Sequence, residues 1–316
     1  MRFPKKEPNG FSFRPGVYLL LLPLLWIGCR RHEPAAATDL NAAQLAEEME
    51  FYLCKNLLDF YYPGIIDADS GGYITNLAFD GTPKPPHPKM IVSQARHLWT
   101  ACKAAERYPQ DARFRQAADH GFRYLRERMW DRQHGGFYFY LDLPWTDHSL
   151  SGYKKAYGEA FAIFALAAYV KLTGSADALA LAQQAFVWFD DHCHDAHHGG
   201  YYEWITLDGI SRAGAGFRRD LFPADAVNAE WKDYNSSIHI LEAFAELYAV
   251  WPDPLLRKRL EEMLVIIRDT ITTEKGYMRL FFTSDWTAIS YRDSSRAFLM
   301  KNLSYDHVSL DRKSVV

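Results

Sequence analysis

The sequence predicts an all-α fold, an α/α toroid or solenoid of helical hairpins, and two observations carry this prediction. From residue 39 onward, helix-length segments with apolar residues at helical spacing alternate with glycine-rich loops. One loop, Asp-x-x-x-Gly-Gly-aromatic, occurs at 67–73, 131–137 and 195–201, a constant spacing of 64 residues. A fixed period that holds two helices and one loop is typical of stacked helical hairpins.

Seven segments have the pattern expected of helices, and signals at their ends support the assignment. In the first segment, Leu45, Met49 and Tyr52 recur at helical spacing and so share one face. Ser175 and Asp253 are suitable N-cap residues for the helices that follow them. The predicted helices cover residues 39–60, 90–107, 111–129, 155–173, 176–193, 232–251 and 253–271.

The paired glycines of the repeated loop predict a tight reversal with positive φ, which glycine adopts without a steric penalty. The aromatic residue after each pair can pack the loop onto its own hairpin. Gly276 and Tyr277 resemble a degraded fourth copy of the loop.

Charge and composition exclude one class of partner and leave others open. The formal net charge of −3 and the pI near 6.5 give no electrostatic reason to expect a nucleic-acid partner. The aromatic content of 15% is compatible with an aromatic core between helices or with stacking on sugar rings. Cys54, Cys102 and Cys193 are an odd number, so we expect small buried residues and no closed disulfide framework.

Residues 1–29 resemble a bacterial lipoprotein-type signal peptide. Basic residues precede an apolar run over 17–27, and a run of about eleven residues is too short to span a bilayer. The run ends near Cys29, which we expect to be lipidated and to become the mature N-terminus, followed by a tether over 30–38. The protein would then be exported to the periplasmic side of the envelope and attached to the membrane only through its lipid. An uncleaved anchor or ordinary secretion is the alternative.

The sequence lacks a phosphate-cradling glycine loop, a GxSxG elbow and an HExxH motif. The histidine-rich segment 192–198 suggests metal binding. However, His198 occupies the same place in the repeat as His134 and Ser70, and the spacing does not match a zinc template. We therefore assign this segment to the repeated loop and expect neither a metal nor a cofactor.

Polar residues on three predicted helices are candidates for a functional site. Arg96 lies on the second helix, and Tyr157 opens the fourth. On the sixth, Asn235, His239 and Glu242 fall at i, i+4 and i+7 and form one polar stripe.

A polar stripe on a helix that packs on both sides is favourable only where it faces a wet cavity. His239 in such a place can exchange a proton near neutral pH, because an unperturbed histidine has a pKa of about 6.5. The alternative is a core histidine whose ring is fully hydrogen-bonded.

Four segments closely resemble the N-acylglucosamine 2-epimerase family, and cellobiose 2-epimerases within it. These segments are residues 89–96, 155–161, 235–242 and 280–286. The resemblance runs in order from about residue 40 to Ser309, so several motifs agree at once.

The resemblance implies an (α/α)6 barrel of twelve helices with its pocket along the axis. It also implies cofactor-free epimerisation at C2 of a reducing-end sugar, through ring opening and a cis-enediol, with β-1,4-linked disaccharides or a monosaccharide as substrate. His239 matches one of the family's acid/base histidines, and Arg96 matches the arginine that stabilises the developing enediolate. Tyr157 and Asn235 match positions that contact the sugar.

The resemblance stops at Ser309, where the family continues with an aromatic residue, Gly-His-Asp and a long further segment. That segment carries the partner histidine, a final catalytic histidine and sugar-stacking tryptophans. Here residues 310–316 follow instead. We therefore expect a C-terminally truncated epimerase domain over 39–309, with about seven of the twelve helices, an aberrant tail and impaired activity.

Two other hypotheses remain open. One is a different enzyme on the same toroid, either a mannose isomerase or a glycoside hydrolase. A hydrolase needs two carboxylates that flank the glycosidic bond, and Glu159 and Glu242 are the candidates, although nothing marks them as a pair. The other hypothesis is a non-catalytic product, a sugar-binding remnant or a misfolded fragment.

Overall fold

The computed structural model describes residues 41–141, 153–209, 231–302 and 308–309. The chain divides into two units, residues 1–51 and 52–316, and the features discussed below belong to the second unit, apart from helix α1. The signal peptide with Cys29, the tether over 30–38 and the tail over 310–316 lie outside the described residues. The expectations for these three segments stay predictions.

Within the described residues, the seven predicted helical segments are confirmed, with ends that shift by a few residues. The α-helices are α1 (Ala42–Tyr52), α2 (Asp59–Tyr61), α3 (Ile91–Arg107), α4 (Ala112–Tyr124), α5 (Ala156–Thr173), α6 (Ala176–Cys193), α7 (Tyr234–Val250), α8 (Pro254–Ile266) and α9 (Arg296–Lys301). The π-helical turns η1 (Leu53–Leu58), η2 (Leu125–Met129) and η6 (Ile267–Ile271) follow α1, α4 and α8. Helix α9 was not predicted, because six residues are too few to display a helical period.

The predicted caps are present. Ser175 accepts a hydrogen bond from the backbone N–H of Ala178, and Asp253 accepts from the N–H groups of Leu255 and Leu256. These side chains satisfy N–H groups that a helix leaves without an internal partner at its start.

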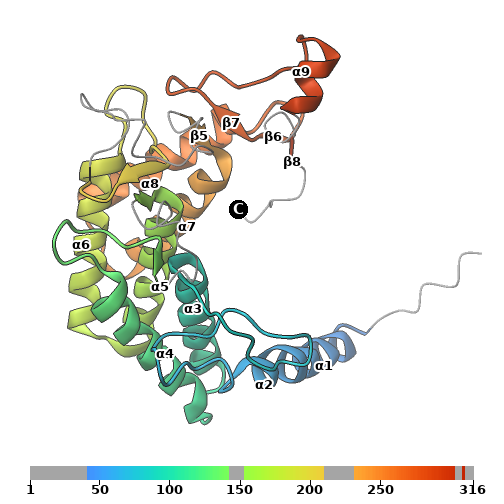
Figure 1. Ribbon diagram of the computed structural model, residues 1–316, viewed down its shortest axis with the longest axis vertical. Helices are drawn as coiled ribbons and strands as arrows, with labels where there is room; N and C mark the ends of the chain where they lie inside the picture. The colour runs from blue at the N-terminus through green and yellow to red at the C-terminus, as the bar shows by residue number, and fades with distance from the viewer. Residues whose placement is uncertain (1–40, 142–152, 210–230, 303–307, 310–316) are drawn as a thin grey trace, which may run out of the picture. The chain divides into compact units, whose positions relative to one another are not determined.

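Helices α3, α5 and α7 form an inner row, and each packs against the helix that follows it in the chain (Figure 1). Helix α5 contacts α3, α7 and its own hairpin partner α6, which explains why it is apolar on every side and mostly buried. Helices α4 and α8 pack against α3 and α7 in the same way. The hairpins therefore stack in chain order, as the 64-residue period predicts.

Short antiparallel strands fasten the start of each inner helix to a later loop. The strands are β1 (Lys89–Met90), β2 (Tyr140–Leu141), β3 (Tyr153–Lys155), β4 (Trp204–Thr206), β5 (Lys232–Asp233), β6 (Met278–Arg279), β7 (Phe281–Phe282) and β8 (Val308–Ser309). They pair as β1–β2, β3–β4, β5–β7 and β6–β8, so α3, α5 and α7 each begin directly after a paired strand. This arrangement fixes the first turns of the three inner helices to one another through the loops.

The repeated loop has the tight reversal that its glycines predict. In each copy the N–H of the aspartate donates to the carbonyl of the second glycine, as from Asp131 to Gly136 at 2.9 Å. Gly135 and Gly136 have φ of 75° and 70°, and a Cβ on either would come within 2.5 Å of the Trp188 side chain. Gly276 also has positive φ, but in its loop Thr273 takes the place of the aspartate. The N–H of Gly276 donates to the carbonyl of Thr273, as expected of a degraded copy.

A buried lysine binds the aspartate of every complete loop, a pairing that the sequence pattern did not predict. The Nζ atoms of Lys89, Lys154 and Lys232 lie 2.6, 2.8 and 2.6 Å from the carboxylates of Asp67, Asp131 and Asp195. Each lysine sits in or beside the strand that precedes an inner helix. The ion pairs therefore tie the glycine loop to the start of that helix.

Candidate active site

Four predicted site residues lie in the N-terminal halves of the inner helices. Arg96 is on α3, Tyr157 is in the first turn of α5, and Asn235 and His239 are in the first two turns of α7. Because α5 packs against both α3 and α7, these residues approach one another despite their separation in sequence.

The ring of Phe161 is the centre of the cluster. The guanidinium carbon of Arg96 lies 4.5 Å from the centroid of this ring, within the range of a cation–π interaction. The ring of His239 lies 4.5 Å from the same centroid, and Tyr157 meets His239 edge-on at 5.3 Å. The structure thus brings Arg96, Tyr157 and His239 together, and Asn235 lies one helical turn before His239 on α7.

The ring of His239 is oriented by Glu242, one turn further along α7. Nδ1 lies 2.7 Å from a carboxylate oxygen of Glu242, and 13% of the His239 side chain is exposed. A carboxylate only accepts hydrogen bonds, so Nδ1 is the donor to Glu242, and in the neutral imidazole Nε2 is the nitrogen that keeps its lone pair. Nε2 is buried and has no hydrogen-bond partner among the described residues.

This geometry provides an oriented proton acceptor whose ring contacts the same aromatic ring, Phe161, as the guanidinium of Arg96. Arg96 is exposed, whereas Nε2 of His239 is covered and the rings of Tyr157 and Phe161 lie against the imidazole. A ligand that reaches Nε2 has to displace part of this cover. The cluster is suited to removing a proton next to a carbonyl whose developing negative charge the guanidinium stabilises.

The suggestion that Glu159 and Glu242 form the carboxylate pair of a hydrolase is wrong in this structure. Glu159 is fully buried and accepts a hydrogen bond of 2.7 Å from the backbone N–H of Phe137 in the second glycine loop. Burial raises the pKa of Glu159 to about 8. Glu159 therefore binds the backbone of the second glycine loop, while Glu242 binds the ring of His239.

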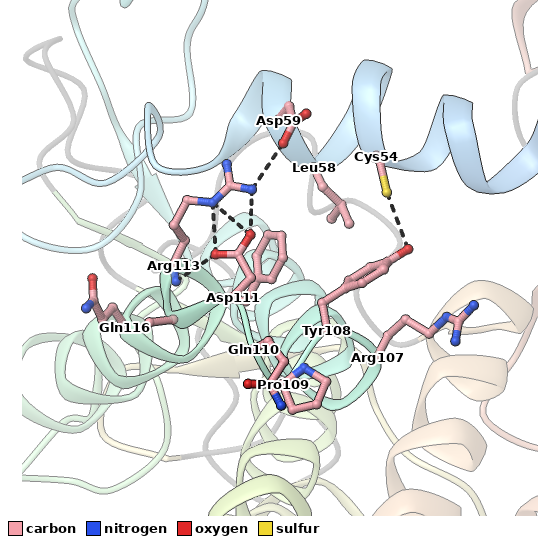
Figure 2. Close-up of a pocket in the computed structure, with 12 residues that line it drawn as sticks. Cys54, Leu58, Asp59, Arg107, Tyr108, Pro109, Gln110, Asp111, Arg113 and Gln116 are labelled. Carbon is pink, nitrogen blue, oxygen red and sulfur yellow. Dashed lines mark hydrogen bonds and ion pairs between the residues drawn. The ribbon is translucent and has the colours of Figure 1, made fainter.

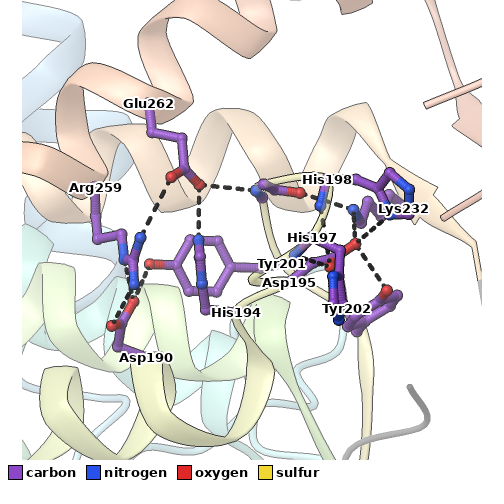
Figure 3. Close-up of polar contacts among 12 residues, drawn as sticks. Asp190, His194, Asp195, His197, His198, Tyr201, Tyr202, Lys232, Arg259 and Glu262 are labelled. Carbon is purple, nitrogen blue, oxygen red and sulfur yellow. Dashed lines mark hydrogen bonds and ion pairs between the residues drawn. The ribbon is translucent and has the colours of Figure 1, made fainter. Parts of the chain in front are cut away.

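The histidine-rich segment contributes to a structural network instead of to the cluster (Figure 3). His194 bonds Glu262 on α8 at 2.8 Å, and Glu262 also accepts from the N–H of Gly200. Arg259 joins Glu262 to Asp190 at the end of α6. In the part of the chain that the structure describes, no group of three His, Cys, Asp or Glu side chains is arranged to hold a metal.

A cavity of about 770 Å³ lies at the other end of α3 and contains none of the predicted site residues (Figure 2). Three of its charged groups are paired with one another, since Arg113 contacts Asp111 at 2.6 Å and Asp59 at 3.1 Å. Cys54 lines this cavity and is half-buried, whereas Cys102 and Cys193 are buried as predicted. The expectation of a buried Cys54 was therefore wrong, and its thiol donates to the Tyr108 hydroxyl at 3.5 Å.

Two residues near the cluster were missed by the sequence analysis. Phe161 was seen only as part of a motif, because its role depends on α3 and α7 meeting at α5. Glu203, next to the first turns of α5 and α7, was missed altogether. Comparison of equivalent positions in the repeats is the signal that would have found it.

Comparison with known proteins agrees with this fold. The family model described as N-acylglucosamine 2-epimerase matches residues 72–301. A cellobiose 2-epimerase of Bacteroides fragilis is 28% identical over 243 residues, which cover 77% of this chain and 60% of that protein. A D-mannose isomerase of Marinomonas mediterranea is 24% identical, with coverage of 73% and 54%.

Among solved structures, a cellobiose 2-epimerase from Spirochaeta thermophila superposes with a TM-score of 0.66 and 31% identity. The superposition covers 78% of this chain and 59% of that one. The chain thus spans about 60% of the length of these two cellobiose 2-epimerases. The fold class is the α/α toroid that the hairpin repeat predicts, and with a family match over most of its length the chain belongs to the N-acylglucosamine 2-epimerase family.

Proposed function

We propose that the protein is a cofactor-free 2-epimerase that acts on the reducing-end sugar of β-1,4-linked disaccharides such as cellobiose. The observation that carries this proposal is the unpartnered Nε2 of His239, oriented by Glu242 and lying in one cluster with Arg96. The relatives from Bacteroides fragilis and Spirochaeta thermophila, both named cellobiose 2-epimerases, support the substrate class.

In the proposed step, the sugar ring is open and its C1 aldehyde lies toward Arg96. Nε2 of His239 takes the proton from C2, and the electrons of the C2–H bond form the C1–C2 double bond of a cis-enediol. The aldehyde oxygen gains negative charge, which the guanidinium of Arg96 stabilises. Tyr157 and Asn235, as sugar contacts, hold C2 within reach of Nε2.

Epimerisation also requires a proton on the opposite face of C2. The cluster of described residues contains one histidine, so a second acid has to complete the inversion. Without that acid, the imidazolium of His239 can still return a proton to the face from which it came. The two half-reactions are therefore separable by experiment.

A second candidate reaction is aldose–ketose isomerisation, and the likeness to a D-mannose isomerase favours considering it. The same enediol protonated at C1 instead of C2 yields a ketose. His239 and Arg96 keep their roles in both reactions, so only the product distinguishes them.

The experiment that tests the proposal is incubation of the protein with cellobiose in D2O, followed by NMR of the reducing-end C2–H. Proton abstraction by His239 predicts exchange of this hydrogen for deuterium. Inverted product shows that the second acid operates, a ketose points to isomerisation, and free glucose would indicate hydrolysis. His239→Ala is expected to abolish exchange.

The matched control is His197→Ala, which removes an exposed histidine of the loop after α6. This variant should exchange at the wild-type rate. Absence of exchange in the folded wild-type protein, or exchange that survives in His239→Ala, contradicts the proposed role of His239.

A further inference from the structure

Glu203 occupies a position that the repeat otherwise fills with a buried apolar residue. The carbonyls of Phe139, Glu203 and Leu280 each accept the N–H of the first residue of an inner helix, at 3.1, 2.9 and 3.0 Å. The three positions are therefore equivalent. Phe139 and Leu280 are each 6% exposed, and neither carries a charge. A carboxyl in this position loses hydration and requires polar partners, so packing of the hairpins does not explain it.

The partners of Glu203 come from the first turns of two inner helices. Its Oε2 accepts from the hydroxyl of Ser236 on α7 at 2.7 Å and from the backbone N–H of Tyr157 on α5 at 3.2 Å. Its Oε1 lies 3.9 Å from Nζ of Lys155, the residue before α5. One carboxyl thus joins two helix starts that belong to different hairpins.

A second carboxyl meets Glu203 at Ser236. Asp233, the N-cap of α7, accepts the N–H of Ser236 at 2.8 Å while Glu203 accepts its hydroxyl. Burial raises the pKa of Glu203, the charge of Asp233 raises it further, and burial also raises the pKa of Asp233. The charged groups that face Glu203 are Asp233 and Lys155.

We propose that Glu203 is a positioning residue for the sugar site, which sets the spacing between the first turns of α5 and α7. The backbone N–H of Tyr157 donates directly to Glu203, and Ser236 is adjacent to Asn235 and one turn before His239. The inference rests on the proposed function, because these are the residues assigned to the sugar and to the proton.

The apolar contact between α5 and α7 does not by itself fix the first turns. N–H groups in a first turn have no partner inside their own helix, so the position of that turn depends on outside acceptors. Glu203 supplies such an acceptor from the residue before β4, which is itself paired with β3. Reacting groups need placement to within about 0.5 Å, so loss of this link is expected to act on sugar binding and not only on folding.

Two substitutions distinguish the hydrogen bonds that Glu203 accepts from the negative charge and the volume of its side chain. Glu203→Gln keeps an oxygen that can accept both hydrogen bonds, whereas Glu203→Leu keeps a similar volume and accepts neither. Leu280→Ala is the control, because it disturbs the equivalent position of another repeat without touching the link. Ser236→Ala removes one of the two bonds and serves as a milder variant if Glu203→Leu does not fold.

The first measurement is independent of sugar. In protein with labelled histidine and tyrosine, a nuclear Overhauser contact between the rings of His239 and Tyr157 should be present in wild type, Glu203→Gln and Leu280→Ala. It should be lost or weakened in Glu203→Leu, and less strongly in Ser236→Ala. If the contact between the two rings is unchanged in both Glu203→Leu and Ser236→Ala, Glu203 has no positioning role.

The second measurement is cellobiose affinity by calorimetry, well below the melting temperature of each variant. The expected weakening is roughly tenfold or more for Glu203→Leu, with little change for Glu203→Gln and Leu280→Ala. Unchanged affinity in Glu203→Leu contradicts the proposal. If wild type binds no cellobiose but the ring contact responds as expected, the positioning of Tyr157 by Glu203 stands and the proposed sugar function fails.

Discussion

Gln94 and Glu159 occupy the same place in successive repeats, five residues after the buried lysines Lys89 and Lys154. Gln94 accepts the N–H of Tyr73 at 2.7 Å and donates its amide to the carbonyl of the same residue at 3.0 Å. Glu159 accepts the N–H of Phe137 in the same way, but its second oxygen is buried without a partner among the described residues. When Glu159 is protonated, its hydroxyl is a hydrogen-bond donor in the place where Gln94 has its NH2 group.

The first prediction is that Glu159→Gln stabilises the protein above about pH 5 and flattens its stability profile. Unfolded Glu159 ionises near its ordinary pKa of about 4.3, whereas burial raises the pKa in the folded protein to about 8. Between these values the folded state binds more protons, so stability falls as the pH rises and levels off above pH 8. Thermal melts from pH 4 to 9 measure this. Gln94→Glu is the reciprocal control and should steepen the fall, while parallel profiles would refute the idea.

The second prediction concerns the buried Lys–Asp pairs. Lys154→Met leaves the buried carboxylate of Asp131 without its lysine partner, and breaking a buried ion pair costs on the order of 3–5 kcal/mol. Lys103→Met, which removes a partly exposed pair with Glu246, should cost no more than about 1 kcal/mol. Urea unfolding of both variants measures the difference, and equal losses would contradict the structural role assigned to the loop lysines.

The third prediction is that the stability of the protein at acid pH depends on the same buried Lys–Asp pairs. Burial alone would raise the pKa of Asp131, but hydrogen bonds from Lys154 and from the loop backbone outweigh it and lower the pKa to about 2. The stabilisation is therefore present above pH 4 and is lost as the pH falls from 4 toward 2. Melts in this window should show a steep loss that Asp131→Asn reduces. An unaltered acid limb in this variant would assign the loss to other carboxyls.

The fourth prediction tests the orientation of His239. Glu242→Ala removes the acceptor that fixes the imidazole tautomer, and we expect C2 deuterium exchange to slow by about 10- to 100-fold. Glu246→Ala, one turn further along the same helix, is the matched control and should leave exchange unchanged. Circular dichroism establishes that both variants are folded. Equal exchange in the two variants would remove Glu242 from the proposed mechanism.

The fifth prediction addresses the N-terminal segment. If Cys29 is lipidated, metabolic labelling with a radioactive fatty acid in a bacterial host should mark the protein and place it in the membrane fraction. Cys29→Ser should lose the label and accumulate with its signal segment uncleaved. Cys54→Ser, which alters a half-buried cysteine inside the domain, is the control and should keep the label.

The sequence by itself determined the hairpins, their order and the polar stripe of α7. The exposed and buried faces of a helix appear in the sequence as polar and apolar residues with a period of 3.6. The 64-residue repeat identifies the helical hairpin as the repeating unit. The sequence alone therefore places His239 and Glu242 on one stripe and Asp131 in a loop.

Only the tertiary structure decided which of these faces meet. Phe161 became the platform between Arg96 and His239 because α5 packs between α3 and α7. Glu203 became a link between two hairpins because strand pairing carries it to the first turns of α5 and α7. Local periodicity records the face that a helix presents, but the partner of that face depends on packing between segments far apart in the chain.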